Sequence, residues 1–197
     1  MRLSLTVAQP ATYPACMRST RVLAAASCML SMTALVPEPA QAKSFDSWSE
    51  VTVSLRGSMT PWEPHRTLGL EMDKTGIDVF ACPKKRAKSA IRVAYASVSG
   101  QRSFSVLEQP NGTRCVKTSL RGYGKVGKVV NLGYVFDVYG KCGKPKCPAS
   151  SVAKGAIVQS RPYPKSASLA TVRIRATGLT YEELRWITSG LTLVAFN

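Results

Sequence analysis

The chain has a single histidine, His65, and the residues beside it have side chains suited to acid–base chemistry. It lies in the segment Thr60-Pro-Trp-Glu-Pro-His-Arg66, so Glu63 and Arg66 are its near neighbours. A carboxylate, a histidine and an arginine together can transfer a proton and hold a phosphodiester, as in small secreted ribonucleases. The two prolines of the same segment equally fit a rigid surface loop with an exposed histidine. We favour the loop and keep the catalytic role as the alternative.

Four cysteines follow residue 42 of the chain: Cys82, Cys115, Cys142 and Cys147. Behind an export signal, which is described below, an even number of cysteines predicts two disulfides. Three pairings are open. We favour Cys82 with Cys115 and Cys142 with Cys147, because the segment CGKPKC contains a glycine and a proline that let it turn back on itself. A zinc site is the alternative, but structural zinc sites usually hold two closely spaced pairs. We therefore expect neither a metal nor a cofactor.

Two short motifs admit a functional and a local structural explanation. Residues 122–127, GYGKVG, match the dinucleotide fingerprint G-x-G-x-x-G, but that motif needs a helix opening at its third glycine, and a strand pattern follows here. We predict a flexible loop carrying Lys125 and Lys128. Asn111-Gly112-Thr113 is a glycosylation sequon and also a turn signal, and we favour the turn. We find no nucleophile elbow, paired-histidine metal motif or phosphate-binding loop.

Basic residues are concentrated in the second half of the chain. The formal net charge is +16, and residues 84–165 hold 17 lysines and arginines but only two acidic residues, Glu108 and Asp137. Such a surface attracts polyanions and does so less as salt rises, although a charged surface can also serve solubility alone. The densest cluster follows Cys82-Pro83, so we expect it on a loop. The candidate anion-binding residues are Lys84, Lys85, Arg86, Lys88, Lys125, Lys128, Lys141, Lys144 and Lys146.

The N-terminus has the layout of a secretory signal peptide. Arg18 and Arg21 precede an apolar run, Val22 to Val36, and Ala40-Gln41-Ala42 forms a small-x-small cleavage pattern. The run is shorter than the about 20 residues that span a bilayer, so a membrane anchor is the weaker alternative. A lipoprotein anchor at Cys28 is another, and Met17 is an alternative start. We expect a signal peptide at 1–42 and one secreted or periplasmic domain at 43–197.

The rest of the chain is typical of strands joined by turns. Alternating or β-branched segments bounded by Gly, Pro, Asn or Ser predict strands. A hairpin is expected across Ser99-Gly100-Gln101, and a second turn at Pro110-Asn111-Gly112-Thr113. The predicted strands are residues 51–57, 76–82, 91–98, 102–109, 115–120, 129–139, 155–160 and 169–177.

One helix is expected close to the C-terminus. Thr180 is a good N-cap and Glu183 completes a capping box, while Gly190 is placed to end the helix as a C′ residue. Leu184 and Ile187 share one face, which we expect to pack on the sheet. Trp186 points the other way, and we expect it to be covered by a neighbouring loop or to contact a partner protein. The fold class is α+β, mainly an antiparallel β-sheet with one C-terminal helix packed on it.

The segments Phe104–Gln109, Val135–Tyr139 and Gly178–Leu191 together resemble the closing part of secreted bacterial LolA and MucB/RseB-like domains, the lipoprotein-carrier and sigma-regulator group. The resemblance implies a curved antiparallel sheet wrapped around helices, with a concave side that holds lipid or acyl chains. The chain departs from that group in its two predicted disulfides, its basic excess and its lack of a long N-terminal helix.

These observations predict a non-enzymatic secreted or periplasmic binding protein. Its basic face would engage anionic lipid, wall polymer or an acidic envelope protein. We do not expect nucleic acid as the partner, because an exported protein meets little of it. The alternative is a small secreted basic hydrolase or toxin that acts on phosphodiesters through His65. A third hypothesis is an envelope protein that contacts a partner through Trp186.

Overall fold

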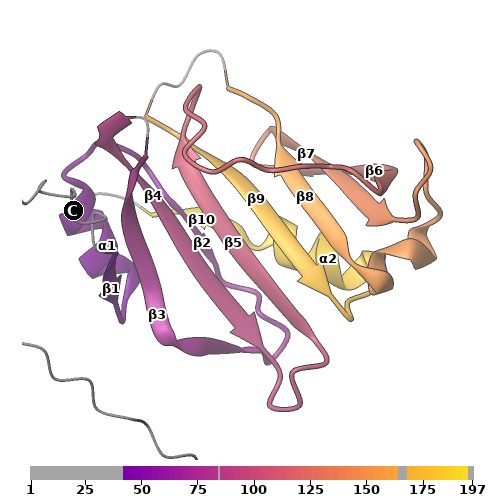
Figure 1. Cartoon of the computed structure of the whole chain (residues 1–197). Helices are drawn as coiled ribbons and strands as arrows, with labels where there is room; N and C mark the ends of the chain where they lie inside the picture. Colours follow the sequence, from indigo (N-terminus) through magenta and orange to yellow (C-terminus); the bar gives the residue numbers. More distant parts are fainter. Residues whose placement is uncertain (1–41, 84, 164–167, 195–197) are drawn as a thin grey trace, which may run out of the picture. The chain divides into compact units, whose positions relative to one another are not determined.

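Eight strands form one antiparallel sheet, and strands from two distant parts of the chain meet at its centre (Figure 1). The computed structural model describes residues 42–83, 85–163 and 168–194. The predicted signal peptide, residues 1–42, therefore lies outside the described residues except for Ala42. The strands lie in the order β1-β3-β4-β5-β9-β8-β7-β6. Their bounds are β1 Lys43–Phe45, β3 Glu71–Cys82, β4 Lys85–Ala96, β5 Ser103–Pro110, β6 Tyr123–Asn131, β7 Tyr134–Lys141, β8 Ala156–Ser160 and β9 Ala170–Thr177.

The strand order shows how the chain crosses the sheet. Hairpins join β3 to β4 and β4 to β5, and the chain then passes to the far edge at β6. From there β7, β8 and β9 return one by one until β9 pairs with β5, from Ser103 opposite Thr177 to Pro110 opposite Ala170. The central pair thus joins residues about 60 to 75 positions apart, which sequence-local signals do not specify.

One face of the sheet, which we call the inner face, is covered by the remaining elements. These are α1 (Trp48–Leu55), the short 3-10 helix η1 (Ala149–Lys154), α2 (Tyr181–Ser189), and a two-stranded sheet of β2 (Trp62–Pro64) and β10 (Leu191–Leu193). The side chain of Trp62 is fully buried between them and the sheet, and its Nε1 donates a hydrogen bond to the Ala170 carbonyl. Figure 1 shows α2, β2 and β10 behind the sheet, which leaves the opposite, outer face toward the viewer.

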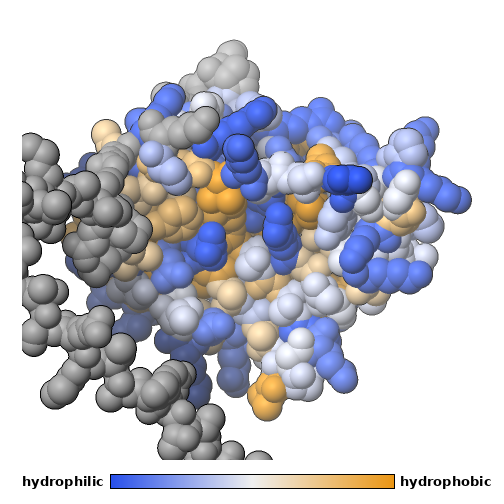
Figure 2. Space-filling model, in the orientation of Figure 1, coloured by the Kyte–Doolittle hydropathy of each residue, from blue (hydrophilic) through white to orange (hydrophobic). Residues whose placement is uncertain are grey.

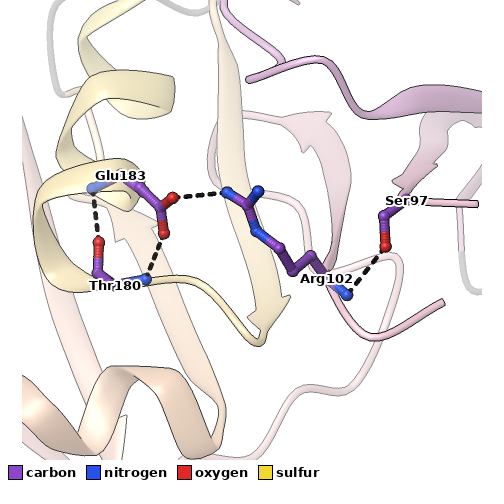
Figure 3. Close-up of polar contacts among 4 residues, drawn as sticks. All are labelled: Ser97, Arg102, Thr180 and Glu183. Atoms are coloured by element: carbon purple, nitrogen blue, oxygen red, sulfur yellow. Dashed lines mark hydrogen bonds and ion pairs between the residues drawn. The ribbon is translucent and has the colours of Figure 1, made fainter. Parts of the chain in front are cut away.

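The C-terminal helix α2 is confirmed with its predicted start. The Thr180 hydroxyl accepts from the Glu183 amide, and the Glu183 carboxylate accepts from the Thr180 amide, which completes the capping box. Arg102, in the turn between β4 and β5, forms an ion pair with Glu183, and its own amide donates to the Ser97 hydroxyl (Figure 3). Leu184 and Ile187 are buried as expected. The cap therefore also fastens the helix to a hairpin of the sheet.

Gly190 ends α2 as predicted, but it is the C-cap residue and not the C′ residue after it. Its φ is −94°, which other residues also adopt. A Cβ at this position would lie 2.5 Å from the Arg66 side chain. Glycine is required here because the Arg66 side chain packs against the end of the helix, not because of backbone geometry.

The strand predicted at 51–57 is wrong, because residues 48–55 form the helix α1. Ser47 caps it by accepting from the Glu50 amide, and the buried residues Trp48, Val51, Thr52 and Leu55 follow the helical period. Val53, which the strand pattern placed on the buried side, is 77% exposed. The segment satisfies both periods over seven residues, and packing against the sheet selects the helical one.

The single strand predicted at 129–139 is a hairpin of β6 and β7. Leu132 and Gly133 form its two-residue turn with φ angles of 49° and 80°, and Asn131 pairs with Tyr134. Positive φ at both turn positions is typical of a type I′ turn, and leucine is an unusual residue there. The strand predicted at 115–120 is also wrong, because these residues belong to the connection between β5 and β6. The strands expected near 76–82, 91–98, 102–109, 155–160 and 169–177 are present.

Glu108 is a fully buried carboxyl on the inner face of β5. Its Oε2 accepts a hydrogen bond of 2.8 Å from the Trp62 amide, while Oε1 is buried and has no partner within the described part of the chain. Burial raises the pKa of Glu108 well above its ordinary value, and the bond from Trp62 offsets this only in part. The folded protein therefore holds this group as the neutral acid over a wider pH range than the unfolded chain does.

We expect Glu108→Gln to flatten the pH dependence of stability. The stabilising contribution of the neutral acid is complete below the unfolded pKa, near 4.5, and is lost as pH rises through the raised folded pKa. Over that window one extra bound proton changes the unfolding free energy by up to about 1.4 kcal/mol per pH unit. Urea unfolding between pH 4 and pH 8 measures the slope, with the exposed Glu182→Gln as control. An unchanged slope in Glu108→Gln would contradict the assignment.

Candidate anion-binding face

The outer face of the sheet collects cations from three strands, β4, β6 and β9, and from the residue after β8. In an antiparallel sheet directly paired residues point to the same side, so the register defines two rows across this face. One row is Arg92, Leu107, Arg173, Gln159, Asp137 and Lys128, and the other is Ala94, Ser105, Arg175, Ile157, Tyr139 and Lys125. Arg161, which directly follows β8, binds Asp137 on the same side. We call the cations Arg92, Lys125, Lys128, Arg161, Arg173 and Arg175 the basic face.

Few carboxylates lie among these cations. Asp78 and Asp137 are the acidic residues in register with them on the described strands. Figure 2 shows the same view of the molecule, with hydrophilic side chains spread over the sheet and hydrophobic surface visible between them. The outer face is thus positively charged with apolar surface at its base.

Arg173 and Arg175, the two arginines of the central strand β9, lack a carboxylate partner among the described residues. Arg173 donates from Nη2 to the Gln159 side chain, and its Nη1 is buried without a hydrogen-bond partner in the described part of the chain. Partial burial, and then the charge of Arg175, lower the pKa of Arg173. The centre of the face therefore carries positive charge that no carboxylate of the described residues pairs with.

At the β6–β7 edge the charges are paired. Asp137 accepts two hydrogen bonds from Arg161, of 2.9 and 3.0 Å, and its Oδ1 lies 2.8 Å from Lys125 Nζ. The bonds from Arg161 are the main reason that the pKa of Asp137 is lowered, and Lys125 adds to the effect. Asp137 thereby partly neutralises two of the six cations.

The β5–β6 connection, residues 111–122, crosses this face. Cys115 forms a disulfide with Cys82, and the pair packs with Phe80 and Ala90 of the outer face. From there the chain must reach Tyr123, which pairs with Lys141 at the opposite end of the sheet. Ile157, which pairs with Arg175 on this face, is only 1% exposed, so part of the outer face is covered.

Residues 85–88 of the predicted cluster begin strand β4 and are not the expected loop. Lys85 pairs with Cys82, and residues 86–88 bulge out before Ser89 pairs with Ala81; Lys85 and Lys88 are both exposed. Lys84 and the side chain of Arg86 lie outside the described residues. The disulfide at Cys82 brings this cluster next to the exposed Arg114 and Lys117 of the β5–β6 connection.

The flexible loop predicted at 122–127 is wrong, because most of these residues belong to β6. A Cβ on Gly124 would lie 1.9 Å from the Lys144 carbonyl oxygen, and one on Gly127 would lie 2.4 Å from the Tyr181 hydroxyl. These glycines mark close packing instead of mobility. The predicted Lys125 and Lys128 belong to the basic face. Lys141 ends β7, while Lys144 and Lys146 lie in the loop closed by the Cys142–Cys147 disulfide, which pairs with the edge of β6 at Lys125.

The His65 segment forms a separate surface site. His65 Nε2 lies 3.7 Å from Glu63 Oε2, and the histidine side chain is 57% exposed. Arg66 turns toward α2 instead, where its guanidinium lies 4.0 Å from the centre of the Trp186 ring and donates to the Ser189 hydroxyl. The arginine that a phosphodiester would need is thus engaged elsewhere. Trp186 is 53% exposed, with the side chain of Arg66 stacked on it.

Four arginines of the basic face were not among the predicted site residues: Arg92, Arg161, Arg173 and Arg175. The sequence does show Arg92, Arg173 and Arg175 alternating with buried Ile and Val, which places them on the polar side of their strands. It does not show that β4 and β9 both lie beside β5. Adjacency of the strands, not the type of residue, was the missing information.

Comparisons with models of known protein families, with curated proteins and with solved structures found no match. The resemblance to LolA and MucB/RseB-like domains stays a prediction. Among the described residues, no helix has the length and apolar composition needed to cross a bilayer. The same residues contain no group of three or more His, Cys, Asp or Glu side chains placed to hold a metal ion.

We expect Asp137→Asn to raise the affinity of the protein for anionic vesicles by about two- to fivefold, because Lys125 and Arg161 lose the carboxylate that they share. At pH 7 the variant should also be less stable. The lowered pKa of Asp137 stabilises the fold above the unfolded pKa, near 3.8, and this contribution is lost as pH falls through the folded pKa. Vesicle co-sedimentation and thermal melts test both, with Asp73→Asn as the charge-matched control. Weaker vesicle binding by Asp137→Asn would contradict the model.

The two disulfides close loops of different length, with 33 and five residues of sequence separation. We expect Cys82→Ser/Cys115→Ser to lower the unfolding free energy by about 3 to 4 kcal/mol and Cys142→Ser/Cys147→Ser by about 2 kcal/mol, because the longer loop restricts the unfolded chain more. Urea denaturation of the two double variants gives the comparison. The reverse order would show that native packing, not loop closure, dominates.

Proposed function

We propose that this chain is a non-enzymatic secreted or periplasmic binding protein whose basic face engages an anionic component of the envelope. The observation that carries the proposal is the pair Arg173 and Arg175 at the centre of the outer face. Neither has a carboxylate partner among the described residues, although one carboxylate, Asp137, pairs with Lys125 and Arg161 toward the sheet edge. Like charges held together destabilise a fold, and a bound anion removes that cost.

The arrangement favours binding over catalysis. Five of the six cations lie on strands of one sheet face, which orients them, and the carboxylate among them, Asp137, is already held by Lys125 and Arg161. Glu63 lies in β2 and His65 directly follows that strand. Both are therefore on the inner side of the sheet. The two disulfides are compatible with an oxidising compartment, which supports an extracellular or periplasmic setting. In such a compartment the candidate partners are anionic lipid, wall polymer or an acidic protein.

Charge reversal at the centre of the face tests the proposal. We expect Arg173→Glu/Arg175→Glu to weaken binding to vesicles of phosphatidylglycerol and phosphatidylcholine by more than tenfold. The matched control, Lys74→Glu/Lys154→Glu, reverses the same charge at two exposed lysines outside the predicted anion-binding residues and should weaken binding by less than threefold. Wild-type binding should fall as salt rises from 50 to 500 mM, because exposed charges are screened.

Three results would count against the proposal. Equal losses in both double variants would mean that net charge alone drives binding. No binding of the wild type to any anionic vesicle or polymer would remove the proposed function. Cleavage of RNA in a gel assay, lost in His65→Ala, would favour the hydrolase instead.

A further inference from the structure

The turn of the β6–β7 hairpin, at one edge of the sheet (Figure 1), holds an exposed leucine in a backbone conformation that leucine rarely adopts. Leu132 has a φ of 49° and is 62% exposed. A bulky residue with positive φ is strained, and a type I′ turn favours asparagine or glycine at this position. Residues held in such conformations cluster at functional sites. Neither turn geometry nor burial accounts for a leucine here.

The turn continues into apolar surface on the outer face. Val130 and Val135 are direct partners across the β6–β7 ladder, and Val130 is 57% exposed. Side chains two positions apart in a strand share a face, so these valines lie beside the exposed Lys128. The amide of Arg161 donates to the Val135 carbonyl, which places this second exposed cation next to the valines. We call Leu132, Val130 and Val135 the apolar tip.

The hairpin is fixed to the rest of the protein from its inner side. The Asn131 side chain donates hydrogen bonds to the carbonyls of Thr188 and Leu191, at the end of α2 and the start of β10. Tyr134, the direct partner of Asn131, packs its ring edge-on against the buried Trp62. The apolar tip therefore lies on a hairpin that is anchored in the core.

Further cations lie at the same end of the sheet as the apolar tip. β5 and β6 run in the same direction, because four antiparallel pairings separate them along the sheet. β4 runs opposite to β5, so it begins at the end of the sheet where β6 finishes. The exposed Lys85 and Lys88 are among the first residues of β4. This end of the sheet thus combines exposed apolar side chains with positive charge.

We propose that the apolar tip inserts into the surface of an anionic lipid bilayer while Lys128 and Arg161 contact the headgroups, and this inference rests on the proposed anion-binding function. An anionic bilayer presents negative charge above an apolar layer, which matches cations placed beside exposed leucine and valine. A soluble polyanion has no apolar layer and would not account for Leu132. A protein partner would need about 800 Å² of surface on each side, far more than three side chains of one hairpin supply.

Leu132→Asn separates membrane binding from stability. Asparagine fits the positive φ of the turn, so we expect the variant to melt at the same temperature as the wild type or higher. Because the apolar side chain is lost, affinity for vesicles of phosphatidylglycerol mixed with phosphatidylcholine should fall by about tenfold in co-sedimentation. Affinity for soluble polyphosphate should change by less than about twofold, since the cations are intact.

Two further variants make the test specific. Leu132→Phe retains an apolar side chain at the tip and should bind the vesicles within about twofold of the wild type. Val98→Asn removes an apolar residue that is 97% exposed in the turn between β4 and β5. That turn precedes β5 and lies at the opposite end of the sheet, so this matched control should bind like the wild type.

The outcomes separate this inference from the proposed function. Vesicle binding that falls in Leu132→Asn but not in Val98→Asn or Leu132→Phe supports insertion of the apolar tip. Equal vesicle binding by the wild type and Leu132→Asn overturns the insertion and leaves the proposed function standing. A wild type that binds polyphosphate but not the vesicles has the same consequence, and one that binds neither overturns both.

Discussion

The antiparallel pairing of β5 with β9 holds the two halves of the sheet together. On one side of this pair lie β4, β3 and β1, and on the other lie β8, β7 and β6. Without it the chain would form two separate meanders, each with a long unpaired edge, and exposed edges of this kind are prone to aggregation. The same pairing sets Val106 beside Ile174 on the inner face and Ser105 beside Arg175 on the outer face. Stability and the candidate site therefore depend on one register.

The inner and outer faces of the β5–β9 pair differ in the charged groups that they accommodate. The inner face is closed by Trp62, the helices and β10, and it tolerates one carboxyl, Glu108, as a buried neutral acid. The outer face keeps unneutralised arginines and is crossed by the β5–β6 connection, which the Cys82–Cys115 disulfide fastens at one end. A protein selected only for stability would place carboxylates among those arginines, as it does at Asp137. Their absence near Arg173 among the described residues is the physical basis for proposing that an anion binds there.

Local signals predicted those elements whose determinants lie within a few residues. Thr180 and Glu183 specify the start of α2, and Ser99-Gly100-Gln101 lies in the turn between β4 and β5, because capping and turn chemistry act over three or four positions. The secondary-structure predictions were wrong where the same residues fit two local structures. Residues 51–55 fit a strand and a helix equally, although Ser47 and Glu50 already carried a capping signal that favours the helix. Leu132-Gly133 lacks the usual turn residues. The sequence pattern therefore predicted one long strand where β6 and β7 form a hairpin.

The sequence by itself determined the fold class, the favoured cysteine pairs, the excess of positive charge, and the side of each strand on which Arg92, Arg173 and Arg175 lie. These properties follow from composition and from a two-residue period, and both are local. Only the tertiary structure decided which strands are neighbours, and hence that Arg92 of β4, Arg173 and Arg175 of β9 and the lysines of β6 share one face of the sheet. It also decided that the glycines of 122–127 mark close packing instead of a loop. Strand order results from burying the whole inner face at once, and that is a property of the entire chain, which no short segment encodes.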